Sequence, residues 1–116
     1  MVTASERKET LEKELERIVP LLTKRYGAQK IFLFGSLARG KVGPWSDLDL
    51  VIIKKTKKRF IERLKEAALL TRADVSIDFL VYTPEEFEEM TSSPRTFQSR
   101  EILQKAKVLY DRTRTH

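Results

Sequence analysis

The chain has 116 residues, of which 41% are apolar and 34% charged, which fits one compact domain over residues 1–116 with one hydrophobic core. It has no cysteine, which excludes disulfides and thiolate metal sites. Its one histidine is the last residue, His116, which argues against histidine catalysis or histidine metal ligation. The formal charge of +6 favours polyanionic ligands such as NTPs or RNA.

No apolar run approaches the roughly 18 residues that a membrane-spanning helix needs. The N-terminal residues show no basic segment followed by an apolar one, as a signal peptide would. We therefore expect a cytoplasmic protein without a membrane partner.

The first elements follow from hydrophobic spacing. A helix is predicted from Ala4 to Tyr26, with a kink or restart at Pro20, because apolar residues recur at steps of three and four: Leu11, Leu15, Ile18 and Leu22. A short buried strand over 31–34 ends at Gly35. A second strand over 48–53 is apolar on both faces, which predicts an interior position in the sheet.

The remaining elements alternate in the same way. A helix is predicted over 60–71, with an inward face made of Ile61, Leu64, Ala68 and Leu69. A strand over 75–82 follows, and then a helix whose start is marked by a capping box with proline at its first position, Thr83-Pro84-Glu85-Glu86. A last helix over 93–105 and an edge strand over 107–110 complete an α/β domain, of order αβαβαβα, around three or four strands.

Gly35, Gly40 and Lys41 match part of a phosphate-binding P-loop. However, Val42 replaces the Ser or Thr that would hold Mg²⁺, and Gly43-Pro44 stands where a long helix must begin. We therefore set the P-loop interpretation aside.

Two acidic residues, Asp47 and Asp49, stand at the start of the second strand. A strand's period of two predicts that both carboxylates lie on one face, with Cα atoms roughly 7 Å apart. Such a pair resists burial unless a cation neutralises it, and carboxylate oxygens suit Mg²⁺. The alternative is that the pair is solvated at the strand end or caps the turn at 44–46.

A third acid lies in the following strand. Asp78 stands within an apolar run, where an unpaired carboxylate is costly, whereas capping or solvation explains Asp74 at the strand's entrance. If the third strand pairs with the second in parallel, Asp78 can approach Asp47 and Asp49. Three convergent carboxylates would form a two-metal site for phosphoryl transfer.

Gly35-Ser36, ten intervening residues, Asp47-x-Asp49 and Asp78 in the next strand together resemble the signature of the DNA polymerase β-type nucleotidyltransferase superfamily. More narrowly, the chain resembles the minimal nucleotidyltransferase (MNT) family, including the antitoxins of HEPN/MNT pairs. The stretches 33–40 and 81–87 share this likeness, which covers about residues 10–110. The resemblance implies the nucleotidyltransferase fold with a small mixed sheet.

The resemblance also implies roles for individual residues. Gly35, Ser36 and Arg39 would bind the nucleotide, Gly35 by letting the backbone approach a phosphate; solvation alone is the alternative for Arg39. Asp47 and Asp49 would bridge two Mg²⁺ ions. Asp78 would hold the catalytic ion and take the proton of the acceptor hydroxyl.

In this family the acceptor is typically a HEPN-domain toxin whose tyrosine receives AMP from ATP, so the resemblance implies a protein adenylyltransferase antitoxin. Two alternatives remain: an enzyme that modifies a small molecule or an RNA end after self-association into a homo-oligomer, and a non-catalytic module that masks a partner. The acidic triad argues against the second.

Two other features have simpler explanations. Trp45 is capable of stacking on a base, but we expect it to pack beside its turn. The basic cluster Lys54, Lys55, Lys57, Lys58 and Arg59 begins roughly 17 Å along the strand from Asp49, too far for NTP phosphates. A solvated turn is expected there, with an acidic partner or RNA as the alternative.

Overall fold

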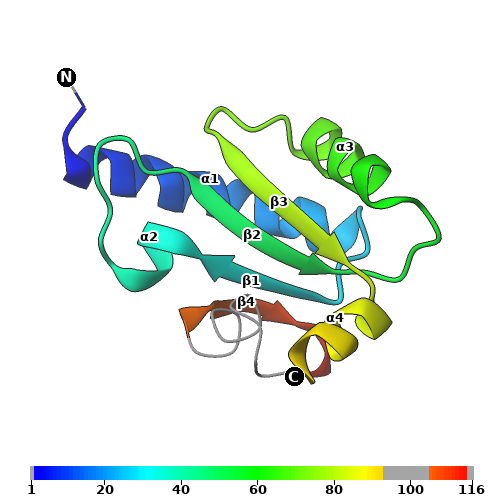
Figure 1. Ribbon diagram of the computed structural model, residues 1–116. Helices are drawn as coiled ribbons and strands as arrows, with labels where there is room; N and C mark the ends of the chain where they lie inside the picture. The colour runs from blue at the N-terminus through cyan, green and yellow to red at the C-terminus, as the bar shows by residue number, and fades with distance from the viewer. Residues whose placement is uncertain (1, 93–104, 115–116) are drawn as a thin grey trace.

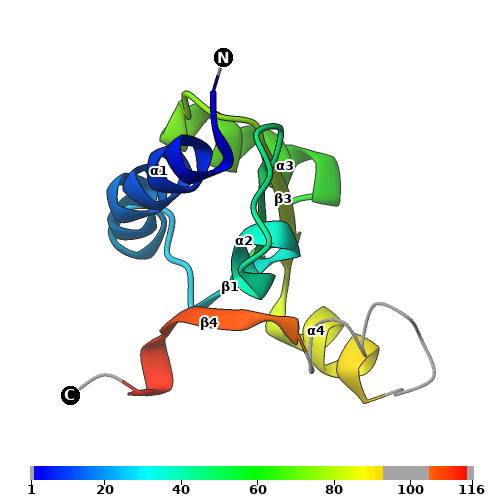
Figure 2. The same ribbon diagram turned by 90° about the vertical axis from the view of Figure 1, so that its left-hand side faces the viewer.

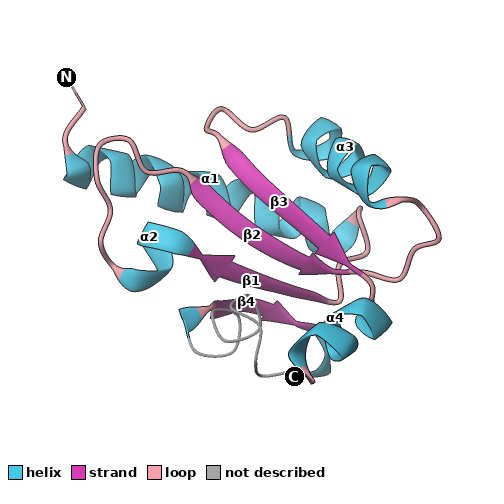
Figure 3. Cartoon of the chain, in the orientation of Figure 1, coloured by secondary structure: helices cyan, strands magenta, loops and turns pink. Residues whose placement is uncertain are grey.

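The computed structural model describes residues 2–92 and 105–114. Within them the element order is α1 (Ala4–Lys24), β1 (Lys30–Phe34), α2 (Gly35–Arg39), β2 (Leu48–Ile53), α3 (Phe60–Thr71), β3 (Ile77–Tyr82), α4 (Pro84–Thr91), β4 (Lys107–Asp111) and the short 3-10 turn η1 (Arg112–Arg114). Figures 1 and 3 show helices lying against a mixed sheet, which confirms the predicted α/β architecture. The predicted helix over 93–105 lies largely outside the described residues.

The sheet has four strands in the order β3-β2-β1-β4. Strand β2 is interior, as predicted, because it pairs antiparallel with β1 and parallel with β3. Strand β4 is an edge strand, also as predicted, and pairs antiparallel with β1. This topology brings the end of β1 and the starts of β2 and β3 to the same end of the sheet.

One face of the sheet carries the hydrophobic core. Helix α1 begins with a capping box, in which the Thr3 hydroxyl accepts from the Glu6 amide at 3.1 Å and the Glu6 carboxylate accepts from the Thr3 amide at 3.3 Å. Its predicted apolar stripe is buried against inward-facing strand residues; the shared cluster includes Leu11, Ile18, Leu22, Leu33, Leu50 and Val81. Helix α3 packs on β3 and α1 on this same side.

The opposite face of the sheet is covered only in part by the described residues. Phe87 of α4 stacks on Phe32 of β1, with ring centroids 5.5 Å apart. Phe32 alternates with the core residues Ile31 and Leu33, so α4 lies across the sheet from α1, as the edge-on view in Figure 2 also shows. The acidic residues at the start of β2 and β3 lie on this less covered face.

Several sequence-based expectations need correction. Helix α1 continues through Pro20 without a restart and ends at Lys24, and β3 begins at Ile77 instead of Val75. The inward face predicted for α3 was only partly right: Leu64 packs against the core, but Ile61 and Leu69 are 53% and 69% exposed, and Ala68 is exposed as well. The buried positions of α3 are Arg63, Ala67 and Thr71. Arg63 tolerates burial because its guanidinium donates to the Val81 carbonyl (3.0 Å) and to the Glu86 carboxylate (2.7 Å).

No helix among the described residues is both long enough and apolar enough to cross a membrane.

Candidate functional site

Asp49 and Asp78 lie side by side on neighbouring strands. They are direct partners in the parallel register of β2 and β3, where adjacent strands run about 4.8 Å apart. Each alternates with buried core residues, Leu48 and Leu50 for Asp49 and Phe79 for Asp78, so both carboxylates project from the opposite face. The parallel pairing that the sequence left conditional is therefore observed, and it brings these two predicted site residues together.

Gly35 borders this pair from the end of β1. Its neighbour Phe34 is the register partner of Asp49, and the chain turns at Gly35 into α2 with φ of +72°. A Cβ atom at position 35 would overlap Oδ2 of Asp49. Glycine is therefore needed twice, for a left-handed backbone and for the close approach of the carboxylate.

The electrostatics of the pair are unfavourable without a cation. Burial raises the pKa of Asp49, and the adjacent Asp78 and Asp47 carboxylates raise this pKa further, while Arg39 opposes them. Asp78 itself is exposed to solvent. Two carboxylates held at contact distance, one of them partly buried, make a site that favours binding a cation.

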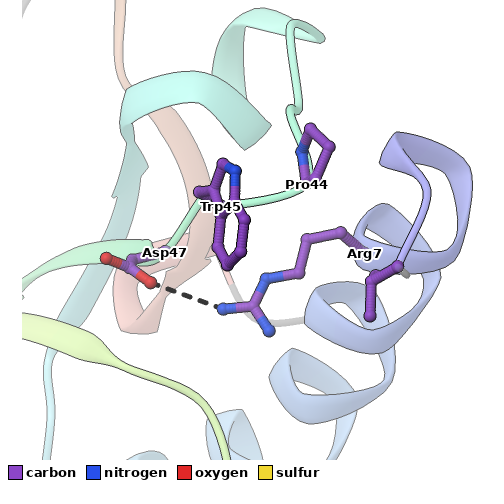
Figure 4. Close-up of a pocket in the computed structure, with 5 residues that line it drawn as sticks. Arg7, Pro44, Trp45 and Asp47 are labelled. Carbon is purple, nitrogen blue, oxygen red and sulfur yellow. Dashed lines mark hydrogen bonds and ion pairs between the residues drawn. The ribbon is translucent and has the colours of Figure 1, made fainter.

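Asp47 lies at the entrance of β2 and contacts a residue of α1. It precedes β2, which begins at Leu48, and its Oδ1 lies 3.4 Å from Nη2 of Arg7 on α1 (Figure 4). Arg7 is anchored there because its Nε donates to the Ser46 carbonyl at 2.7 Å. The sequence analysis did not identify Arg7, since a contact across 39 or 40 positions leaves no local signal in one sequence.

Asp47 is close enough for its charge to act on Asp49, but its carboxylate contacts Arg7 instead of the other two acids. Within residues 2–92 and 105–114, no group of three or more His, Asp or Glu side chains is arranged so that it could hold a metal ion. Asp49 and Asp78 nevertheless supply the oxygen-only donors that Mg²⁺ prefers, and Gly35 leaves space against Asp49 that any other residue would fill. The residues present fit a divalent cation, with Asp47 as a nearby third donor.

The predicted nucleotide-binding residues flank the same end of the sheet. Gly35, Ser36 and Arg39 form α2, which leads directly from β1. The Ser36 carbonyl accepts from the Lys41 amide at 2.9 Å and so helps turn the chain toward β2. Arg39 is exposed, and its charge acts on Asp49. Their positions agree with a phosphate-binding role, which stays a prediction.

Asp74 has a structural setting. Its backbone amide donates to Oε2 of the buried Glu14 at 2.7 Å, and Glu14 also accepts from Nε of Arg17 at 2.6 Å. The charge of Asp74 interacts with Arg17. This network joins α1 to the loop before β3, and the choice of Asp78 as the third acid stays a prediction.

The basic cluster after β2 is largely engaged within the chain. The ammonium group of Lys54 lies 3.6 Å from the centroid of the Tyr26 ring, Lys58 contacts Glu66 at 2.6 Å and Arg59 contacts Glu62 at 3.2 Å. These contacts agree with the expected solvated turn, and the alternative of an acidic partner or RNA stays open. The packing role expected for Trp45 was wrong, because this side chain is 89% exposed.

The family described as "Polymerase beta, Nucleotidyltransferase" matches residues 16–115. A crystal structure from Sulfolobus solfataricus, provisionally described as a nucleotidyltransferase, is similar with a TM-score of 0.66 and 19% identity, covering 96% of this chain and 89% of that one. No curated protein sequence matches.

A second similar structure is a tyrosine-to-alanine mutant of the toxin–antitoxin complex MntA-HpeT. Its TM-score is 0.51 at 22% identity, and the alignment covers 83% of this chain and 71% of that chain. At this level of identity both structures establish similarity of fold.

Proposed function

The chain belongs to the polymerase β nucleotidyltransferase family, and on that basis we propose that it transfers a nucleoside monophosphate from an NTP, with ATP the expected donor, to an acceptor hydroxyl. The observation that carries this proposal is the pairing of Asp49 with Asp78 beside Gly35. A strand pair has no structural need for two abutting carboxylates, which repel each other and lower stability unless a cation joins them.

In the proposed mechanism, Asp49 and Asp78 would hold Mg²⁺, together with Asp47 once its carboxylate leaves Arg7. Bound Mg²⁺ would neutralise the triphosphate and stabilise the charge that develops during transfer. Gly35 and Ser36 would receive the β- and γ-phosphates at the start of α2, and Arg39 would add a positive charge at its end.

The chemical step is an in-line displacement at the α-phosphorus. The acceptor oxygen forms a bond to this phosphorus, the bond to the oxygen that bridges to the β-phosphate breaks, and pyrophosphate leaves. The proton of the acceptor hydroxyl passes to the carboxylate of Asp78, which is exposed on the edge strand β3 and so lies open to an incoming acceptor.

We further propose that the acceptor is a protein, a HEPN-type toxin modified on a tyrosine, and that the chain acts as its antitoxin. The MNT-like motifs support this proposal, and MntA-HpeT gives a toxin–antitoxin precedent for the same fold. The open position of Asp78 also favours an acceptor pocket supplied by a second chain, because in-line transfer requires the hydroxyl to be held in place.

The reaction class can be tested with ATP labelled at either the α- or the γ-phosphate. We expect the acceptor to retain the α label while the γ label leaves as pyrophosphate, and only with Mg²⁺ present. Transfer of the γ label to the acceptor would show a kinase and contradict the proposal.

The acceptor can be tested by intact-mass spectrometry of a HEPN-type protein encoded beside this chain. We expect its mass to increase by one AMP after incubation with the chain, ATP and Mg²⁺. An unchanged mass, together with efficient labelling of a small molecule or RNA end by this chain alone, would replace the antitoxin proposal with the self-associating enzyme.

A further inference from the structure

Trp45 is the most exposed large apolar side chain that the structure describes. Its side chain is 89% exposed, and it is the one tryptophan in the sequence. Burying an indole normally provides a large hydrophobic gain, and exposed tryptophan is enriched where proteins bind ligands and partners. Trp45 therefore contributes no buried area to the protein's own core, and its ring is available to a ligand or partner.

A cavity of about 290 Å³ lies beside Trp45. It is lined by Val2, Arg7, Pro44, Trp45 and Asp47, and Figure 4 shows the last four around it. The turn that presents the ring is held by two hydrogen bonds between Gly43 and Ser46, at 2.8 Å and 3.1 Å. The backbone that carries the Trp45 ring is therefore held in one turn conformation.

The polar wall of this cavity is anchored through Nε of Arg7, a contact that does not involve Asp47. Arg7 donates from Nε to the Ser46 carbonyl at 2.7 Å and from Nη2 to Asp47 at 3.4 Å. A guanidinium has five N–H donors in a fixed plane, so these two contacts leave further donors for a ligand. The cavity thus combines one aromatic face with guanidinium N–H groups that are able to donate to acceptor atoms of a ligand.

The cavity adjoins the acidic site. Trp45 is two residues before Asp47, so their Cα atoms are at most about 7 Å apart. In a nucleotide the base is separated from the α-phosphate by the ribose. Asp47 itself lines the cavity, so an α-phosphate beside Asp47 and Asp49 would leave the base, one ribose away, within reach of the cavity and its indole wall.

We infer that this cavity binds the base of the donor nucleotide, with the base stacked on Trp45 and its ring acceptor atoms facing Arg7. The inference rests on the proposed function, which supplies the nucleotide. The ring of an acceptor tyrosine would fit the position less well, because it is bonded directly to the attacking oxygen and would lie at the α-phosphate itself. Stacking on one face favours purines, whose ring area is larger than that of pyrimidines.

The lone tryptophan makes the test direct, since its fluorescence reports on this ring alone. Titration with Mg²⁺ and ATP or GTP should quench the emission, whereas Mg²⁺ and inorganic tripolyphosphate, which has no base, should bind without quenching. Binding of each probe is measured in parallel by calorimetry.

Substitution then measures how much the ring contributes. Trp45→Ala should weaken ATP binding on the order of ten- to a hundredfold and leave the affinity for tripolyphosphate unchanged. Trp45→Phe should restore part of the affinity. The control is Leu69→Ala, which removes another exposed apolar side chain, on α3, and should bind all probes as the wild type does.

Wild-type ATP affinity in Trp45→Ala would overturn the inference while leaving the proposed function intact. The same holds if Trp45→Ala binds ATP normally but transfers poorly to the acceptor, because Trp45 would then contact the acceptor. Failure of the wild type to bind either ATP or tripolyphosphate would contradict the proposed function as well.

Discussion

Asp49 and Gly35 are fitted to each other: the Oδ2 atom of Asp49 fills the space that a side chain at position 35 would need. Because Gly35 also has φ of +72°, a substitution there disturbs both the backbone and the carboxylate. Gly40, at φ of +70°, has no atom within 4 Å of its own hypothetical Cβ. Substitutions at Gly35 and Gly40 should therefore cause similar backbone strain, but only a substitution at Gly35 should also displace Asp49.

Gly35→Ala and Gly40→Ala should each lower the free energy of unfolding by about 1–2 kcal/mol, the cost of a left-handed conformation for a residue with a side chain. Only Gly35→Ala should also weaken Mg²⁺–ATP binding severely, because the Asp49 carboxylate must move. Urea unfolding and calorimetry measure the two effects. Equal nucleotide affinity in the two variants would show that the position of Asp49 is not important for binding.

Asp49→Asn should raise the melting temperature of the metal-free protein at pH 7. The pKa of Asp49 is raised in the folded state by burial and by Asp78. The protonated Asp49 therefore contributes its full free energy of stabilisation below the unfolded pKa, about 3.9. This contribution is lost as the pH rises through the folded pKa, so ionised Asp49 does not stabilise the protein at pH 7. The gain should therefore shrink at pH 4.

The same variant should lose most of the stabilisation by Mg²⁺–ATP. In the wild type this stabilisation is about 2.7 kcal/mol at a hundredfold excess of ligand over Kd. Thermal melts with EDTA and with Mg²⁺–ATP give both quantities. Asp74→Asn is the control and should give no increase, because Asp74 interacts favourably with Arg17. A lower melting temperature for Asp49→Asn with the ligand shift retained would contradict the site.

Glu14→Gln should lower the free energy of unfolding at pH 7 by about 1–3 kcal/mol, since Glu14 is buried and accepts charged hydrogen bonds from Arg17. Its pKa is lowered chiefly by Arg17, so this stability is present above the unfolded pKa, about 4.3, and is lost as the pH falls through the folded pKa. Urea unfolding at pH 7 and pH 3 checks both points.

Mg²⁺–ATP affinity should be unaffected in Glu14→Gln, because the network lies outside the site. The exposed Glu16→Gln is the control and should change stability by less than about 0.5 kcal/mol. A loss of nucleotide binding in Glu14→Gln without loss of stability would mean that the Asp74 loop belongs to the site.

The sequence predicted the local elements best. The bounds of β2 and α3 agree with the expected 48–53 and 60–71, because hydrophobic runs and turn residues set them locally. The inward face of α3 was predicted correctly at Leu64 but missed Arg63, whose burial depends on its partners Val81 and Glu86, 18 and 23 residues away. Periodicity counts apolar residues and does not detect such partners.

The candidate site, like the fold, was predictable from local sequence patterns but not in its contacts between distant residues. Strand alternation predicted one face for Asp47 and Asp49, whereas the contact of Asp78 with Asp49 depended on parallel pairing, which only the fold shows. The contact of Asp47 with Arg7 was not predictable, because the two residues are 40 positions apart in the sequence. Trp45 was expected to pack because large aromatic residues usually do, and its exposure is a property of the folded turn.

In the proposed reaction, Asp78 holds Mg²⁺ together with Asp49 and accepts the proton of the acceptor hydroxyl during nucleotide transfer. The most direct test compares the rate of transfer from α-labelled ATP to the acceptor for wild type, Asp78→Asn and Asp74→Asn. We predict that Asp78→Asn reduces the rate by orders of magnitude, because it removes a metal ligand and the proton acceptor, while Asp74→Asn stays within a few-fold of wild type. Near-wild-type transfer by Asp78→Asn, or inactivity of Asp74→Asn instead, would contradict this assignment.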